Sequence, residues 1–260
     1  MNRLVLPLVL VIGLAALVAA GWYALDRFGH GRGSGAVATE QRGVPAFSRI
    51  RVDGTADVLL VQGTEHSVTV EASARSLRDI RTEVSDGTLM IQSSERHRWW
   101  SRLLGRASRS PRIVVTFRNL EAIVAAGTVT IRSDELKLDR LAISASGAAT
   151  LKLAGLEAKA FVFDGSGAIK ADVGGRVAEQ SISISGAGDY RAPGLASQQA
   201  RIAVSGAGRV VVNAAKTLDV EISGAGTVDY LGNPEVTKKV SGAGRVKRRE
   251  AIGEAHSAIV

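Results

Sequence analysis

The stretch RIAVSGAGRVVV at residues 201–212 carries the pattern that decides the fold. Its apolar residues and its two glycines alternate with polar or small residues, so that Ile202, Val204, Gly206 and Gly208 share one parity. A period of two is typical of an extended strand with one set of side chains turned toward a core. Glycines within the inward set leave room where the chain bends or another backbone approaches closely. The stretch therefore predicts two short strands joined at a corner.

The Ser-Gly-Ala-Gly corner recurs along the chain. Exact copies begin at Ser185, Ser205, Ser223 and Ser241, and degenerate copies are assigned at Val124, Ser146 and Asp164. Successive starts are 18 to 22 residues apart. A repeat of this length cannot bury its apolar face alone and must stack on its neighbours. The sequence thus predicts an all-β solenoid that behaves as one cooperative domain. We expect its structural corner glycines to be Gly147, Gly165, Gly167, Gly186, Gly188, Gly206, Gly208, Gly224, Gly226, Gly242 and Gly244.

A weaker copy of the corner lies near the N-terminus, around Asp53-Gly54-Thr55-Ala56. It is followed by a strand-like run at residues 67–72 and by a hairpin pattern in which Asp86-Gly87 separates residues 80–85 from residues 88–92. Asp-Gly between two alternating runs is typical of a tight β-hairpin turn. We expect these strands to form a cap over the first repeat, whose edge would otherwise be unpaired.

The repeated Ser-Gly-Ala-Gly corners after an N-terminal Val-Asp-Gly segment resemble the bacterial autotransporter adhesin head domains, also called the GIN domain family. The likeness covers roughly residues 47–246. It implies a right-handed parallel β-helix-like solenoid with a role in adhesion. It implies no catalytic residues.

Residues 4–25 are apolar and uncharged, which is long enough to span a bilayer. Trp22 and Tyr23 favour one N-terminal transmembrane helix, whereas the small residues at 18–20 leave a cleaved signal peptide open. The predicted organisation is an anchor or signal peptide at 1–25, a flexible glycine-rich tether at 26–45, the β-solenoid domain at 46–250 and a tail at 251–260. Within the domain we expect the first coil and hairpin at 46–95, an Arg/Trp insertion at 96–112 and the repeats at 113–250. This organisation predicts an envelope protein, anchored in the inner membrane and facing the periplasm, or secreted if the segment is cleaved.

Arginines, tryptophans and leucines crowd into the Arg/Trp insertion. On a helical wheel its aromatic and leucine side chains fall within one arc of about 140°, opposite the arginines. This is typical of an interfacial amphipathic helix that contacts anionic lipid or an anionic envelope polymer. The alternative is that the segment covers the open end of the first repeat. The candidate contact residues are Arg98, Trp99, Trp100, Arg102, Leu103, Leu104 and Arg106.

The chain is basic, with 33 Lys and Arg against 25 Asp and Glu. In an exported chain this charge favours anionic envelope material, and we expect no nucleic-acid partner. A second basic cluster, Arg245 and Lys247 to Arg249, closes the array and is expected to solubilise its end.

Four scattered histidines and the absence of cysteine predict no metal site, and no motif predicts a cofactor. Asp164, Asp189 and Asp229 come nearest to the clustered carboxylates of polysaccharide-processing β-helix enzymes. Arg209 and Thr227 occupy the intervening equivalent positions, so the sequence predicts no enzyme.

The expected function is adhesion or envelope binding by surface contact. The expected partners are the membrane, through the N-terminal helix, and an anionic envelope polymer, glycan or envelope protein. The alternative is a structural or envelope-stress-related interaction protein without a soluble ligand.

Overall fold

The computed structural model describes residues 37–93 and 110–250, which lie within one compact unit, Ala36–Val260. The described part is all-β, as predicted, apart from one short helix. Its elements are β1 (Val37–Gly43), β2 (Arg49–Gln62), β3 (Ser67–Ser73), α2 (Ala74–Asp79), β4 (Ile80–Ser85), β5 (Thr88–Ser93), β6 (Arg112–Phe117), β7 (Ala122–Gly206), β8 (Arg209–Gly224), β9 (Thr227–Leu231), β10 (Glu235–Gly242) and β11 (Arg245–Arg248). They form one sheet in which the main path runs β1-β3-β6-β2-β7-β8-β9-β11.

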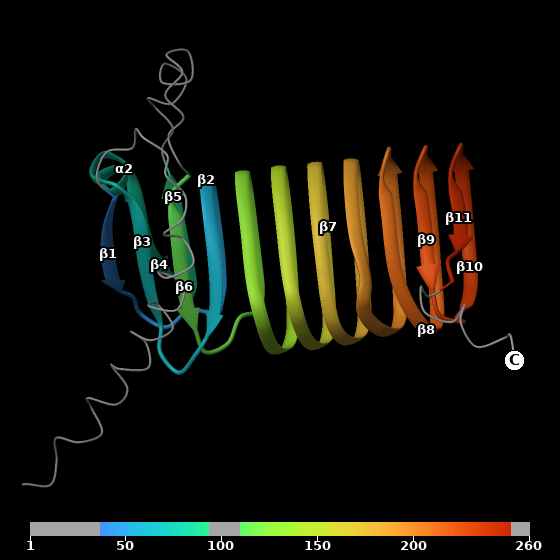
Figure 1. Ribbon diagram of the computed structural model, residues 1–260, viewed down its shortest axis with the longest axis horizontal. Coiled ribbons are helices and arrows are strands. Elements are labelled where there is room, and N and C mark those ends of the chain that lie inside the picture. Colours follow the sequence, from blue (N-terminus) through green and yellow to red (C-terminus); the bar gives the residue numbers. More distant parts are fainter. Residues whose placement is uncertain (1–36, 94–109, 251–260) are drawn as a thin grey trace, which may run out of the picture. The chain divides into compact units, whose positions relative to one another are not determined.

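The long strands pair in parallel, with corner opposite corner. Gly54 of β2 is the register partner of Gly127, and Gly224 of β8 is the partner of both Gly206 and Gly242. Figure 1 shows the successive passes of β7 lying side by side between β2 and β8. Each pass provides hydrogen-bond partners for the next, as where the Ala207 amide donates to the Gly186 carbonyl at 3.0 Å. The repeat unit of the sequence is therefore also the pairing unit of the structure.

One glycine of each corner has a positive φ and stacks on its counterpart in the preceding repeat. The φ values lie between +92° and +124°, and from Gly127 onward a Cβ would come within 2.3 to 2.9 Å of backbone oxygen. No L-residue fits this backbone, and the clash would be with main chain that cannot yield. These glycines, which we call the stacking glycines, are Gly54, Gly127, Gly147, Gly167, Gly186, Gly206, Gly224 and Gly242.

The stacking glycines correct two of the predicted repeat starts. The degenerate copies were aligned at Val124 and Asp164, but the stacking residues there are Gly127 and Gly167. The corners consequently recur every 18 to 20 residues. The predicted repeat starts were matched by the positions of glycines in the sequence. The structure instead repeats one backbone conformation, which Gly167 shares with Gly186 and Gly165 does not.

In the corners around Gly167, Gly186, Gly206, Gly224 and Gly242, a second glycine makes room for a branched side chain. A Cβ on Gly188 would lie 2.5 Å from Ile184 Cγ2, and one on Gly208 would lie 3.0 Å from Val204 Cγ1. A Cβ on Gly165 would lie 2.9 Å from Ile169 Cγ1. We call these residues the spacing glycines, and none of them has a positive φ. The spacing glycines leave room for a neighbouring side chain, while the stacking glycines allow the positive φ and the close approach of two backbones.

The inward side chains form a single apolar core that runs through the repeats from Phe47 to Val228. Phe161, Phe163 and Tyr190 are its largest fully buried members in the middle repeats. The rings of Phe163 and Tyr190 lie 5.8 Å apart between centroids, which links one repeat to the next. Continuous burial across repeats agrees with one cooperative domain.

The N-terminal end is covered by additional strands. The predicted hairpin is confirmed: β4 and β5 pair antiparallel, and Asp86 and Gly87 both have positive φ in the turn. Strand β5 then adds in parallel to one half of β2, while β6 and β3 extend the other half.

The tether prediction is wrong for residues 37–43, which form β1 antiparallel to β3. Arg42 explains why this polar stretch is ordered. Its guanidinium donates to the Ile80 carbonyl at 2.9 Å, the Thr82 hydroxyl at 3.0 Å and the Glu40 carboxylate. The side chain fastens β1 to the hairpin by hydrogen bonds that a glycine-rich composition does not reveal.

The C-terminal end carries charged side chains at inward positions. Lys238 of β10 is the register partner of the buried Val220, and Arg248 of β11 is the partner of Tyr230. Val240 beside them is 40% exposed. This last repeat is covered by no further described strand.

Within residues 37–93 and 110–250, no helix is long and apolar enough to cross a membrane. The segment predicted to do so, residues 4–25, lies outside the described residues.

Candidate functional site

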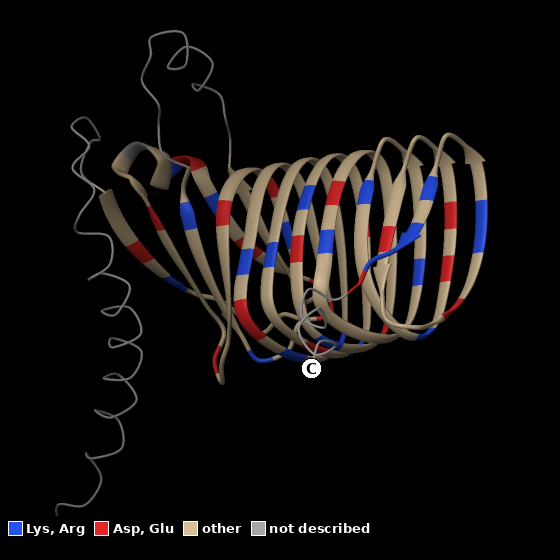
Figure 2. Ribbon diagram, turned by 45° about the vertical axis from the view of Figure 1, so that its right-hand side comes forward, with Lys and Arg blue, Asp and Glu red and all other residues tan. Residues whose placement is uncertain are grey.

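The strands that follow each corner present two outward columns, three and five residues after the stacking glycine. Figure 2 shows basic and acidic positions on neighbouring strands of the array. In the last four repeats the first column holds Asp189, Arg209, Thr227 and Arg245. The second column holds Arg191, Val211, Asp229 and Lys247. The stacking therefore brings together charges that are 18 to 20 residues apart in sequence.

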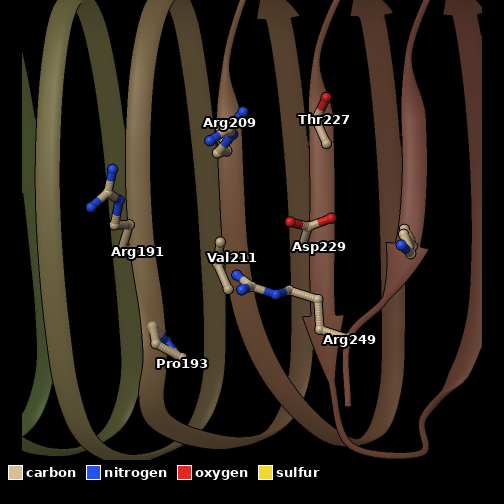
Figure 3. A pocket seen from close by; sticks show the side chains of 8 residues that line it. Arg191, Pro193, Arg209, Val211, Thr227, Asp229 and Arg249 are labelled. Atoms are coloured by element: carbon tan, nitrogen blue, oxygen red, sulfur yellow. The ribbon is translucent and has the colours of Figure 1, made fainter. Parts of the chain in front are cut away.

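A groove of about 450 Å³ lies on this face. Its volume falls within the ~300–1,000 Å³ typical of ligand sites. Pro193 and Val211 form its apolar part. Its polar lining, most of which is labelled in Figure 3, consists of Arg191, Arg209, Thr227, Asp229, Lys247 and Arg249. We call this hollow the basic groove.

An irregularity in repeat length accompanies the groove. The repeat from Gly186 to Gly206 has two more residues than the repeat from Gly206 to Gly224. The pairing of β7 with β8 accordingly shifts register between Arg191 and Ala196, on either side of Pro193. Proline lacks the amide that a regular ladder needs, which suits it to such a break.

A buried polar cluster lies in the core at the register shift. Ser197 donates to the Asn213 carbonyl at 2.7 Å, and the buried Gln180 amide donates to the Ser197 hydroxyl at 2.8 Å. The Tyr190 hydroxyl completes the cluster, 3.5 Å from Gln180 Oε1, and burial raises the pKa of this hydroxyl above its usual value. The cluster satisfies polar groups that the shifted ladder leaves without regular partners. It thereby supports the backbone beneath the groove.

Arg249 lines the groove directly after the end of β11. The Arg249 amide donates to the Tyr230 carbonyl at 2.8 Å, which continues the parallel pairing of β11 with β9, and Figure 3 shows the Arg249 side chain extending toward Val211. Val211 is only 5% exposed although it occupies an outward column.

Of the charged side chains that line the groove, only Arg191 forms an ion pair within the described structure. Arg191 is held by Asp189, with its Nη2 2.6 Å from Oδ2, and this carboxylate raises the pKa of Arg191. The other charged side chains of the lining form no hydrogen bond or ion pair in the described structure; they are Arg209, Asp229, Lys247 and Arg249. Three cations and one carboxylate thus remain available to a ligand.

The predicted contact residues of the Arg/Trp insertion, from Arg98 to Arg106, lie outside the described residues. The three aspartates considered for catalysis do not form a carboxylate pair. Asp189 is bonded to Arg191, Asp229 lies in the other column, and Asp164 lies before its corner. Among the described residues, no group of three or more His, Cys, Asp or Glu side chains is placed to hold a metal ion.

Sequence reasoning missed the basic groove. It assigned Lys247 and Arg249 only to the end of the array, and it did not connect them with Arg191 and Arg209. Aligning the positions three and five residues after each stacking glycine would have placed Lys247 in the same column as Arg191 and Asp229. The change in repeat length and Pro193 are visible in the sequence, but the register shift that accompanies them and the direction of the Arg249 side chain depend on tertiary structure.

Comparison with solved structures shows the same fold. A protein described as a "putative adhesin" from Bacteroides fragilis matches with a TM-score of 0.76 at 19% identity, covering 83% of this chain and 98% of its own. A "putative adhesin" from Parabacteroides distasonis matches with a TM-score of 0.62 at 24% identity, covering 84% and 98%. A "putative lipid binding protein" from the same species matches with a TM-score of 0.64 at 18% identity, again covering 84% and 98%.

Among curated proteins, none matches the chain significantly. A family model does match, over residues 46–234, which extend from β2 to β9 and include most of the residues that line the basic groove. The chain belongs to the family described as "Putative auto-transporter adhesin, head GIN domain".

Proposed function

We propose that the protein is an adhesion module of the cell envelope that binds anionic envelope polymer by surface contact, without catalysis. The observation that carries the proposal is the basic groove, in which three uncommitted cations from the repeats on either side of β9 line one hollow. Clustered cations of this kind attract polyanions and strengthen contact through several weak interactions at once. The adhesin description of the family supports the same role.

We further propose that the repeats form a right-handed parallel β-solenoid. The parallel registers between β2, β7, β8 and β10 and the stacking glycines support it. Such an array presents a long, regular outer surface, and its columns of side chains suit contact with an extended partner.

In this role the repeats lie outside the cytoplasm, and the apolar residues 4–25 serve as a membrane anchor. The absence of cysteine means that no disulfide is needed for stability in that compartment. We also propose that the residues of the Arg/Trp insertion contact anionic lipid. The test of this contact is the replacement of Trp99 and Trp100 with serine, which we expect to lower binding to anionic vesicles.

Binding of the full chain, held in a neutral detergent, to purified anionic cell-wall polymer tests the groove. We expect the double variant Arg209→Gln/Lys247→Gln to bind about tenfold more weakly, because two charge contacts are lost. We also expect wild-type binding to fall as salt rises.

A matched control is available within the same columns. Lys170 stands three residues after Gly167, as Arg209 does after Gly206, and Lys152 stands five residues after Gly147, as Lys247 does after Gly242. The double variant Lys152→Gln/Lys170→Gln removes the same charge outside the groove and is expected to retain binding. Equal losses in both double variants would show that net charge, and not the groove, holds the polymer.

A further inference from the structure

Resting on the proposed function, we infer that the basic groove takes an acidic saccharide, a glycan segment that carries acid groups on hydroxyl-bearing rings. The feature that distinguishes this ligand from other polyanions is Asp229. Its carboxylate lies in the groove among cations and yet forms no ion pair with any of them.

A carboxylate in this position opposes the binding of a simple polyanion. Asp229 lowers the positive potential of the groove and repels acid groups that approach it. A ligand with acid groups alone would bind better without it. Sugar hydroxyls, in contrast, donate hydrogen bonds to a carboxylate, and such charge-assisted bonds are stronger than neutral ones.

The arrangement of the strands separates the two kinds of contact. Thr227 and Asp229 lie on β9, which is flanked by the strand of Arg209 on one side and the strand of Lys247 on the other. At the usual strand spacing these flanking strands are about 10 Å apart. Figure 3 shows Thr227 and Asp229 on one strand beside Arg209, with Arg249 extending toward Val211. A strand with hydroxyl-binding groups therefore lies between two strands with acid-binding groups.

The remaining lining fits the body of a sugar ring. Pro193 is exposed on the groove and offers an apolar surface to ring C–H groups. Thr227 contributes a hydroxyl that both donates and accepts. The arginines present planar donors that match carboxylate and phosphate geometry. A saccharide chain lying across the strands would use all three kinds of contact.

The test compares two ligands on the full chain in neutral detergent: an oligogalacturonate, and a poly-L-glutamate of similar charge that has no hydroxyls. The variant is Asp229→Asn, which keeps the shape of the side chain. Loss of one charge-assisted hydrogen bond is expected to weaken oligogalacturonate binding about tenfold. The same variant is expected to bind poly-L-glutamate more tightly, because a repulsive charge is removed.

Asp164→Asn is the matched control. It removes an exposed aspartate on the other side of a corner and is expected to change neither affinity. A sugar-phosphate oligomer in a third arm distinguishes phosphate from carboxylate as the acid group, since tighter wild-type binding than to oligogalacturonate identifies phosphate.

Tighter binding of both polymers by Asp229→Asn would overturn the saccharide inference and leave anionic contact standing. Failure of the wild-type chain to bind any of the three ligands or the cell-wall polymer would overturn the proposed function as well.

Discussion

Two neighbouring corners of the array place one branched side chain and one spacing glycine in opposite order along the chain. In the corner around Gly167, the spacing glycine Gly165 comes first and the branched Ile169 follows. In the corner around Gly186, the branched Ile184 comes first and the spacing glycine Gly188 follows. In both, the inward positions two residues before and two residues after the stacking glycine share a space that holds one branched side chain.

The two glycines of a corner meet different requirements, one of backbone conformation and one of side-chain volume. The stacking glycine keeps its place in both corners because its backbone touches the backbone of the preceding repeat. The spacing glycine changes sides because only the summed volume at the corner matters. A motif with two identical residues therefore contains one that is fixed by conformation and one that is set by packing.

The largest effect is expected for Gly167→Ala, because it violates the requirement that both corners share. Alanine would adopt a φ of +109° and place its Cβ 2.5 Å from the Gly147 carbonyl oxygen. We expect the free energy of unfolding to fall by about 3 kcal/mol or more, measured by urea denaturation followed by circular dichroism. Gly194→Ala is the control, since its nearest contact would be at 3.9 Å. Similar losses in the two variants would contradict the stacking role.

A double-mutant cycle at the second corner tests shared volume. Gly188→Ala would set a Cβ 2.5 Å from Ile184 Cγ2 and is expected to cost about 2 kcal/mol through overpacking. Ile184→Ala is expected to cost about 3 kcal/mol through a cavity. The double variant should lose at least about 1 kcal/mol less than the sum, because the added methyl partly fills the cavity. Additive losses would show that the two residues do not share a space.

The mirrored change at the first corner is expected to be milder. A Cβ on Gly165 would meet Ile169 Cγ1 at 2.9 Å and Phe163 Cε1 at 3.0 Å, so we expect a loss of about 1.5 kcal/mol. Ile169→Ala should relieve only part of this loss, since the Phe163 ring remains. The coupling energy from unfolding of the single and double variants checks this expectation. Coupling as strong as at the second corner would mean that Phe163 moves aside.

The smallest effect is expected in the last repeat, where the same arrangement is open to solvent. Val240 precedes its corner as Val204 does, but Val240 is 40% exposed and Val204 is 2% exposed. We expect Val204→Ala to cost about 2 kcal/mol and Val240→Ala about 0.5 kcal/mol or less. Thermal and urea unfolding of the two variants provide the measurement. Equal losses would show that further chain covers the last repeat.

Much of the fold could be predicted because the same alternation recurs. The parity around Ile202 and Val204 identified the inward face, and Asp86-Gly87 identified the hairpin turn. The exact register failed at Val124 and Asp164, where glycines of different roles look alike in sequence. Strand β1 was missed because the side chain that orders it, Arg42, bonds to residues about 40 positions away.

The candidate site was less accessible to sequence reasoning. Its charges come from separate repeats, and their grouping depends on register to within one residue. A further cause is local: the longer repeat around Pro193 breaks the ladder between β7 and β8. Composition indicated a basic protein, but only stacking shows which cations share one hollow.

Lys238 and Arg248 place charged side chains at inward positions of the last repeat. Each stands where the preceding repeat places Val220 or Tyr230, so any strand laid on this edge would bury an ammonium and a guanidinium without counter-ions. Burying an unpaired ion costs several kcal/mol, and natural sheets use inward-pointing charges to block edge-to-edge growth. Each earlier repeat pairs in parallel with the repeat that follows it, whereas these two charges disfavour such pairing at the last one. Lys238 and Arg248 therefore oppose the addition of a further strand, from the same molecule or from another, at this edge of the sheet.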